Sequence, residues 1–175
     1  MGYDKVWTEP VTFPKWERRA ESARIVGASA QRLHVTALGG SPGGTVEAEV
    51  VRFTSLEALN AAPAGSLTGK IAYVDAGQMV RMQDGSGYGP LTRIRGAGPA
   101  AAAAKGAVAF IMRSVGSDDH RMPHTGTTRY INGVVPLPGF ALAAPDADTV
   151  SRLIEMGETV RIRLSSTAHT YQTVS

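Results

Sequence analysis

Hydrophobic and polar residues alternate in several short segments of the chain, and this pattern predicts β-strands. In Val46–Val50 apolar residues alternate with glutamate, and in Val160–Leu164 they alternate with arginine. A period of two is typical of strands that bury one face and expose the other. Three further segments are expected to form strands: Arg19–Val26, Leu33–Leu38 and Lys70–Val74.

One segment, Ala107–Met112, is apolar at every position. A strand without alternation is typical of the middle of a parallel or mixed sheet, where other elements cover both faces. This segment is therefore expected to be the central strand of a sheet with helices packed on it.

Two main helices are expected beside this strand. The first occupies the alanine-rich segment Pro99–Lys105, and helically spaced residues from Pro90 onward are expected to be separated from it, because a proline breaks or kinks a helix. The second, Pro145–Gly157, begins with proline and ends with glycine, as helices commonly do. A serine cap predicts one or two helical turns at Ser55–Leu59. The whole pattern predicts a mixed α/β fold.

The composition limits the classes of protein to which the chain can belong. Its 175 residues suffice for one domain, or for one domain with arms. With 43% hydrophobic and 19% charged residues it can form a core, and a net charge of +3 is too small to indicate nucleic-acid binding. The absence of cysteine excludes disulfides, thiolate zinc sites and a thiol nucleophile. No segment has the roughly 20 apolar residues of a membrane span, and the first ten residues do not resemble a signal peptide.

A long polar segment, Gly116–Gly133, is expected to be a loop, and loops of this length in compact domains usually have a function. It contains His120 and His124 together with Asp118 and Asp119. Two histidines four residues apart bind a metal together when they lie on a helix, but proline and glycine interrupt this segment and it lacks the glutamate of H-E-x-x-H. Hydrogen-bonding or solvent-exposed histidines are therefore expected here rather than a metal site.

A serine hydrolase triad could be assembled from Ser114 or Ser117 with His124 and Asp118. The chain lacks the G-x-S-x-G motif that presents a nucleophilic serine, and a chain of this size contains such a triple by chance. The residues alone therefore predict no catalytic group.

Other segments suggest contacts rather than catalysis. Gly85–Pro90 resembles a phosphate-binding loop but lacks the G-K-[ST] ending, and Tyr88 within it is an aromatic residue on an exposed loop, which favours contact with another molecule. Trp7 and Trp16 are expected to anchor the N-terminal arm on this domain or on a neighbour. Six arginines are either surface charges or, if clustered, ligands for a carboxylate or phosphate: Arg81, Arg93, Arg95, Arg113, Arg121 and Arg129.

Several segments, taken in order, resemble a known domain family. They are Tyr3–Val11, Trp16–Arg18, Leu38–Ser41, Ala100–Gly106 with the following strand to Val115, Pro123–Gly126, Val135–Pro138 and Ala144–Ala147. Together they are similar to the protease-associated (PA) domain inserted in zinc exopeptidases of the plasma glutamate carboxypeptidase (carboxypeptidase Q) type and their bacterial aminopeptidase relatives. The resemblance extends from Tyr3 to about Ser175.

This resemblance implies a swivelling β/β/α fold, in which a curved sheet or open barrel of strands is flanked by two main helices. It implies a PA domain at residues 16–166, with arms at 1–15 and 167–175 that lead to a catalytic domain outside this chain. In the family that catalytic domain binds two zinc ions and carries motifs such as G-H-x-D-S, which does not occur here. The chain is accordingly expected to contribute no catalytic residue, no cofactor site and no metal ligand.

The resemblance also implies a role over the active-site cleft of a secreted or periplasmic exopeptidase. The expected partners are the catalytic domain, the peptide substrate and further copies of the parent protein, with no nucleic acid among them. The residues expected to meet the substrate or the catalytic domain are Tyr88, Arg113, His124 and Arg129, and the loops Gly85–Pro90 and Ser117–Tyr130 are expected to face the cleft. The alternative is a free-standing module that binds an extended peptide or a partner protein.

Overall fold

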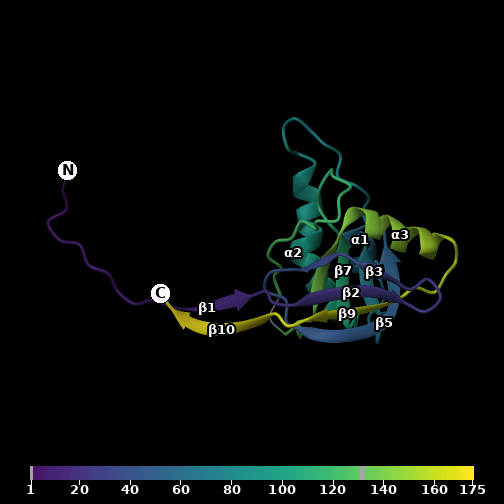
Figure 1. The fold of residues 1–175 in the computed structure, drawn as a ribbon, viewed down its shortest axis with the longest axis horizontal. Helices are drawn as coiled ribbons and strands as arrows, with labels where there is room; N and C mark the ends of the chain where they lie inside the picture. The colour runs from purple at the N-terminus through teal and green to yellow at the C-terminus, as the bar shows by residue number, and fades with distance from the viewer. Residues whose placement is uncertain (1, 131–132) are drawn as a thin grey trace.

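The computed structural model describes residues 2–130 and 133–175 and contains a curved sheet with three helices and a separate two-stranded ribbon (Figure 1). The strands and helices of the described residues are β1 (Thr12–Glu17), β2 (Glu21–Val26), β3 (Gln31–Leu33), β4 (Val35–Ala37), β5 (Gly44–Phe53), α1 (Leu56–Ala61), β6 (Ile71–Val74), α2 (Tyr88–Ala104), β7 (Ala109–Arg113), β8 (Gly139–Leu142), α3 (Ala144–Glu155), β9 (Arg161–Ser166) and β10 (His169–Val174). The predicted mixed α/β class, with a curved sheet and two long helices, is confirmed.

The main sheet has eight strands in the order β3-β2-β9-β5-β6-β7-β8-β4. Strands β5 to β8 run parallel to one another, and the remaining neighbours are antiparallel. The sheet curls so that β2, next to one end, approaches β4 at the other end, where the Glu21 carboxylate on β2 accepts the backbone N–H of Ala37 on β4 at 2.7 Å. The sheet is therefore a nearly closed barrel.

The core has two parts, one on each face of the central strands. Inside the curve, Ala109 and Ile111 of β7 pack with β2, β5, β9 and the apolar side of α3. On the outer face, Phe110 and Met112 of the same strand pack with α1 and α2. This explains why the segment shows no alternation, and it confirms the prediction of a central strand covered on both faces.

Helix α2 differs from its prediction. It runs unbroken from Tyr88 to Ala104 with Pro99 inside it, so the expected break at Pro99 is wrong. Proline cannot donate the helical hydrogen bond, but here the backbone carbonyl of Gly96 accepts the amide of Arg129 at 3.0 Å, so a neighbouring loop supplies a donor near the interruption. The start at Tyr88 also means that Tyr88–Pro90 forms the first helical turn rather than part of a loop.

The predicted strand Leu33–Leu38 is also wrong, because it is two strands in different positions. Strand β3 pairs with β2, whereas β4 pairs with β8 at the other end of the sheet. The chain changes partner at His34, whose backbone N–H donates to the Asp146 carboxylate at 2.6 Å instead of to a strand. The predicted helix at Pro145–Gly157 and the Ser55 cap are confirmed: α3 spans Ala144–Glu155, and Ser55 Oγ accepts the Ala58 amide at 3.0 Å.

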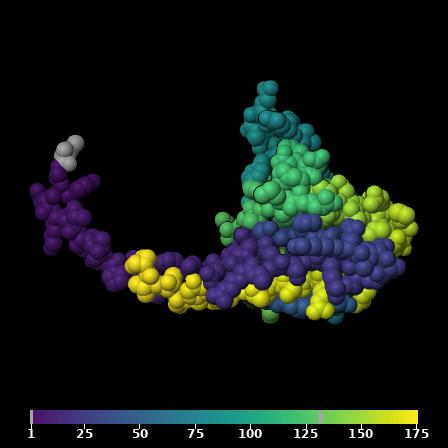
Figure 2. Space-filling view, in the orientation of Figure 1, coloured from purple at the N-terminus to yellow at the C-terminus, as the bar shows by residue number. Residues whose placement is uncertain are grey.

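Two segments from opposite ends of the chain form the ribbon. Strands β1 and β10 pair antiparallel from Thr12 opposite Val174 to Glu17 opposite His169, and the ribbon projects from the body as a narrow arm (Figures 1 and 2). Trp16 anchors its base, with Nε1 donating to the Ser41 carbonyl at 2.8 Å, as predicted. Trp7 is 65% exposed and does not anchor the arm to this domain.

Candidate functional site

The first residue of α2 meets the long loop that follows β7, and together they form a projecting part of the body, which we call the tip (residues 79–90 and 114–130). The Tyr88 hydroxyl and the His124 Nε2 are hydrogen-bonded at 2.8 Å, and their rings are arranged edge to face. Both residues were predicted separately from the sequence as contact residues, and the structure brings them together. Figure 1 shows the tip as the teal and green segments that rise above the sheet.

Beside this pair lies an open hollow of about 470 Å³. Met79 and Met122 contribute apolar surface, while His120 and Ser117 contribute polar groups. Met122 is 76% exposed, and other apolar residues of the tip are exposed to a lesser degree. The hollow thus offers a mixed surface with hydrogen-bonding groups from a histidine and a tyrosine, which suits contact with a polypeptide.

The long loop is held at several points, although it has no helix or strand among its described residues. The backbone N–H of His124 donates to Ser114 Oγ at 2.5 Å, and Thr125 Oγ1 donates to the Ala37 carbonyl at 3.0 Å. Further along, the Tyr130 hydroxyl donates to the Leu137 carbonyl at 2.6 Å, and burial raises the pKa of Tyr130 to about 12. These bonds hold in place the backbone that carries the His124 side chain.

The geometry gives no support to a catalytic triad in the tip. The Ser114 hydroxyl bonds to the main chain of His124 rather than to its imidazole, and that imidazole is engaged by Tyr88. His120 lies 3.4 Å from Asp118, both on the exposed loop. Within residues 2–130 and 133–175, no three histidine, aspartate or glutamate side chains are close enough to hold a metal ion.

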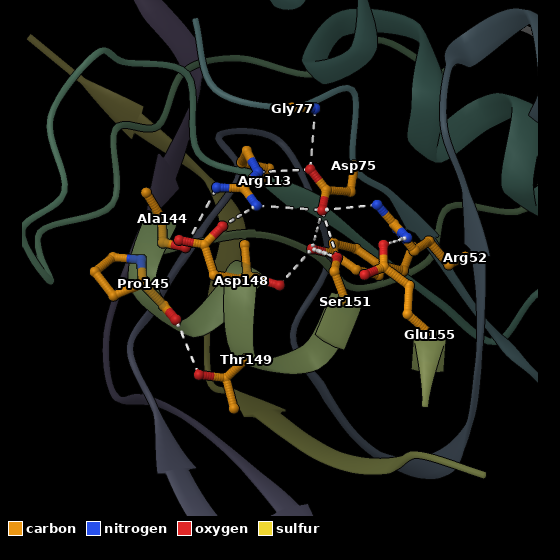
Figure 3. A network of polar contacts seen from close by, with 12 residues as sticks. Arg52, Asp75, Gly77, Arg113, Ala144, Pro145, Asp148, Thr149, Ser151 and Glu155 are labelled. Carbon is orange, nitrogen blue, oxygen red and sulfur yellow. Dashed lines mark hydrogen bonds and ion pairs between the residues drawn. The ribbon is translucent and has the colours of Figure 1, made fainter. Parts of the chain in front are cut away.

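Arg113, the third residue selected from the sequence, is only 8% exposed. Its Nε donates to Asp75 Oδ1 and one Nη2 proton reaches Asp148 Oδ1, both at 2.5 Å, while Nη1 donates to the Ala144 carbonyl at 3.3 Å (Figure 3). With its donors used inside the protein, Arg113 braces β7 against β6 and α3. Contact between Arg113 and a substrate stays an untested prediction.

Asp75 is the centre of this network. It follows β6 directly, is 3% exposed, and accepts hydrogen bonds from Arg113, Ser151, the Tyr73 hydroxyl and the Gly77 amide (Figure 3). Burial alone would raise the pKa of Asp75, but the bonds from Arg113 and Ser151 outweigh it and the pKa lies below its ordinary value. Burial, with the nearby Asp75 charge, raises the pKa of Tyr73 far above its usual range, so Tyr73 stays protonated.

Comparison with known proteins gives strong matches along nearly the whole chain. Human carboxypeptidase Q is 34% identical over 173 residues, which is 97% of this chain but 35% of that protein. The crystal structure of a peptidase M28 precursor from Shewanella amazonensis SB2B is 43% identical with a TM-score of 0.90, covering 99% of this chain and 40% of that one. The chain is homologous to part of carboxypeptidase Q. This confirms the resemblance to the carboxypeptidase Q type seen in the sequence.

More distant matches support the fold alone. A zinc aminopeptidase from Bacillus subtilis has a TM-score of 0.51 at 14% identity and covers 94% of this chain and 36% of that one. No protein-family profile matches the chain. The chain spans 35% of the length of human carboxypeptidase Q and 40% of that of the M28 peptidase precursor.

The fourth selected residue, Arg129, lies away from the Tyr88–His124 pair. It is exposed and lines a separate hollow of about 570 Å³ with Arg93 and Arg95, both on α2. Of the other arginines considered, Arg121 is paired with Asp146 at 3.1 Å. The six arginines therefore do not form one cluster, although Arg93, Arg95 and Arg129 do share a surface.

Sequence reasoning missed the residues around Arg113, namely Asp75, Arg52, Tyr73 and Ser151. Arg52 Nη2 lies 3.6 Å from Asp75, and Ser151 donates to Asp75 from α3, so four elements contribute to this network. One signal was present: Asp75 directly follows an apolar strand, at the carboxyl end where polar groups of neighbouring parallel strands converge. The remaining partners come from distant segments and carry no local pattern.

Proposed function

We propose that this chain is the protease-associated domain of a longer zinc-dependent exopeptidase, and that it contributes no catalytic residue itself. Its homology covers about a third of carboxypeptidase Q and M28 peptidases, as an accessory domain within a larger enzyme would. The two zinc ions, the hydrolytic residues and the main partner of this domain then belong to the rest of the parent protein. The parent is expected to act outside the cytoplasm, secreted or periplasmic.

The observation that carries this proposal is the β1–β10 ribbon. A domain inserted in another needs an entry segment and an exit segment that lie close together. Strands β1 and β10 pair over six residues each, and they bring the two ends of the described fold to the same side (Figure 1). The ribbon therefore has the geometry of a two-stranded connection between this domain and a neighbour.

We assign the tip to the side of the domain that shapes access to peptide substrates. Its support is the combination of exposed apolar residues with the Tyr88–His124 pair on a loop fixed by several hydrogen bonds. Binding residues are often found on such loops, which a rigid scaffold positions. Within the described residues no helix is long and apolar enough to cross a membrane.

The register of the ribbon provides a clean deletion for testing this function. Glu17 and His169 are directly opposite each other, so the segment of the longer protein that corresponds to residues 18–168 of this chain can be replaced by an Asn-Gly turn that closes the ribbon as a hairpin. The shortened enzyme should retain zinc and hydrolyse a small chromogenic substrate. The ratio of its KM values for short and long peptides should differ from that of the complete enzyme, because the domain proposed to control access is absent.

Two results would overturn the proposal. If the ratios of KM between short and long peptides are unchanged in the shortened enzyme, the domain does not shape access. If the pure 175-residue chain hydrolyses dipeptides with added zinc, the domain is itself catalytic. A control deletion that removes only the tip residues 117–122 separates loss of the tip from loss of the entire domain.

A further inference from the structure

A row of arginines crosses three neighbouring strands on the outer face of the barrel, and none of these strands carries a residue of the polar network around Asp75. Arg24 on β2 lies directly opposite Arg32 on β3 and, on its other side, directly opposite Arg163 on β9. Side chains at directly paired positions point to the same face of a sheet, and all three residues are exposed. With neighbouring strands about 4.8 Å apart, the row brings three positive charges within roughly 10 Å.

This arrangement is unfavourable unless something compensates it. Like charges directly opposite each other destabilise a sheet. Only the end of the row is balanced, because Glu47 on β5 lies 3.7 Å from Arg163 and is shared with Arg161 at 3.9 Å. Among the described residues, neither Arg24 nor Arg32 has a carboxylate within salt-bridge distance.

The row also lines an open hollow of about 850 Å³. No acidic residue lines it, and its remaining surface includes the apolar residues Val26 and Ala30. The β2–β3 segment is uncovered on the face drawn in Figure 2, where it forms the purple-blue front of the body. A cationic row beside apolar surface suits a ligand that carries both carboxylates and apolar side chains.

We propose that this face, defined by Arg24, Arg32 and Arg163, is a docking surface for an acidic polypeptide segment. The guanidinium groups bind its carboxylates, since Arg forms paired hydrogen bonds with such groups, and Val26 and Ala30 contact its apolar side chains. This surface goes beyond the proposed function, because it lies on β2, β3 and β9 rather than on the tip. It predicts binding by the isolated chain regardless of any attached peptidase.

A single substitution in the row should raise the stability of the domain and weaken its binding of an acidic peptide. In Arg24→Thr the central charge of the row is lost and replaced by a residue that strands favour. Relief of repulsion should raise the Tm by about 1–4 °C, while binding of a short peptide of alternating glutamate and alanine weakens by about threefold or more. Arg163→Thr should weaken binding as well. An arginine that served only structure would give the opposite sign in the Tm.

The control is Arg152→Gln, which changes the net charge equally but lies at an exposed position of α3, outside both the row and the tip. Binding is measured by fluorescence titration with the glutamate–alanine peptide, with its glutamine counterpart, and with a heparin oligosaccharide, at two salt concentrations. The proposal is supported if Arg24→Thr weakens binding of the acidic peptide and raises the Tm, while Arg152→Gln leaves binding unchanged. Equal loss in both variants, a lowered Tm in Arg24→Thr, or binding of heparin without the acidic peptide would overturn it.

Discussion

Replacing the Asp75 carboxylate by an amide, in Asp75→Asn, removes the charge at the centre of the buried network without changing its size. Asp75 lies 2.5 Å from Arg113 Nε and 3.6 Å from Arg52 Nη2, and it is 3% exposed. Removing one partner of a buried ion pair leaves the other charge without compensation and costs about 3–5 kcal/mol. For a chain of this size that corresponds to a fall in Tm of roughly 6–20 °C.

The matched control is Asp148→Asn, which makes the same chemical change against the same arginine. Asp148 Oδ1 also lies 2.5 Å from Arg113, but the Asp148 side chain is 69% exposed. Exposed ion pairs contribute about 1 kcal/mol or less, so this variant should lose little. The difference between the two variants therefore isolates burial from pairing.

Urea denaturation followed by circular dichroism measures both free energies of unfolding. The pKa of Asp75 lies below its ordinary value in the folded protein, so its contribution is complete above the unfolded pKa of about 3.9 and is lost as the pH falls through the folded value. The gap between wild type and Asp75→Asn should thus narrow on acidification. Equal losses in the two variants, or a gap that widens at low pH, would refute this account of the network.

Two further predictions concern the helix and the tip. In Gly98→Ala the new Cβ would lie 2.4 Å from the buried Phe110 ring, so the free energy of unfolding should fall by about 1–3 kcal/mol. In Gly96→Ala the new Cβ meets open space, so the free energy of unfolding should rise by up to about 1 kcal/mol. Equal effects of the two substitutions would contradict the packing argument. Tyr88→Phe should reduce stability by less than about 1 kcal/mol but raise the KM for peptides in the full-length peptidase. The control Tyr3→Phe, at a residue that is 90% exposed, should change neither quantity. If Tyr88→Phe unfolds the protein, the role of Tyr88 is structural instead.

The parts of the fold that could be predicted are those whose signal is local. Within the uninterrupted apolar run Ala107–Met112, residues 109–112 belong to β7 and are buried on both faces, as the lack of alternation indicates, although Val108 is exposed. The proline and glycine at the ends of α3 mark its limits. The ribbon could not be predicted in this way, because β1 and β10 are polar segments that become strands only by pairing with each other across more than 150 residues. The continuity of α2 through Pro99 could not be predicted locally, because the loop donors to the nearby Gly96 carbonyl come from the distant residues Thr128 and Arg129.

The site shows the same division. Tyr88 and His124 could be selected because each is an unusual residue on a polar segment, but their hydrogen bond depends on the fold. Arg113 was selected as a polar residue near a loop, whereas its position as the last residue of a doubly covered strand indicates burial. A charged residue in such a place needs a buried partner, and that partner could have been sought at the end of a neighbouring strand, where Asp75 lies.

The buried network and the tip are connected through two adjacent residues. Arg113, the last residue of β7, is held by its ion pair with Asp75. The next residue, Ser114, accepts a hydrogen bond from the backbone N–H of His124. Arg121, three residues before His124 in the same loop, is paired with Asp146 at the beginning of α3, and just after His124 the Thr125 hydroxyl donates to the Ala37 carbonyl. The loop is thus fixed to the body by ion pairs before His124 and by a hydrogen bond after it, so an effect of Arg113 on peptide binding would act through the position of His124 and would not require Arg113 to touch the peptide.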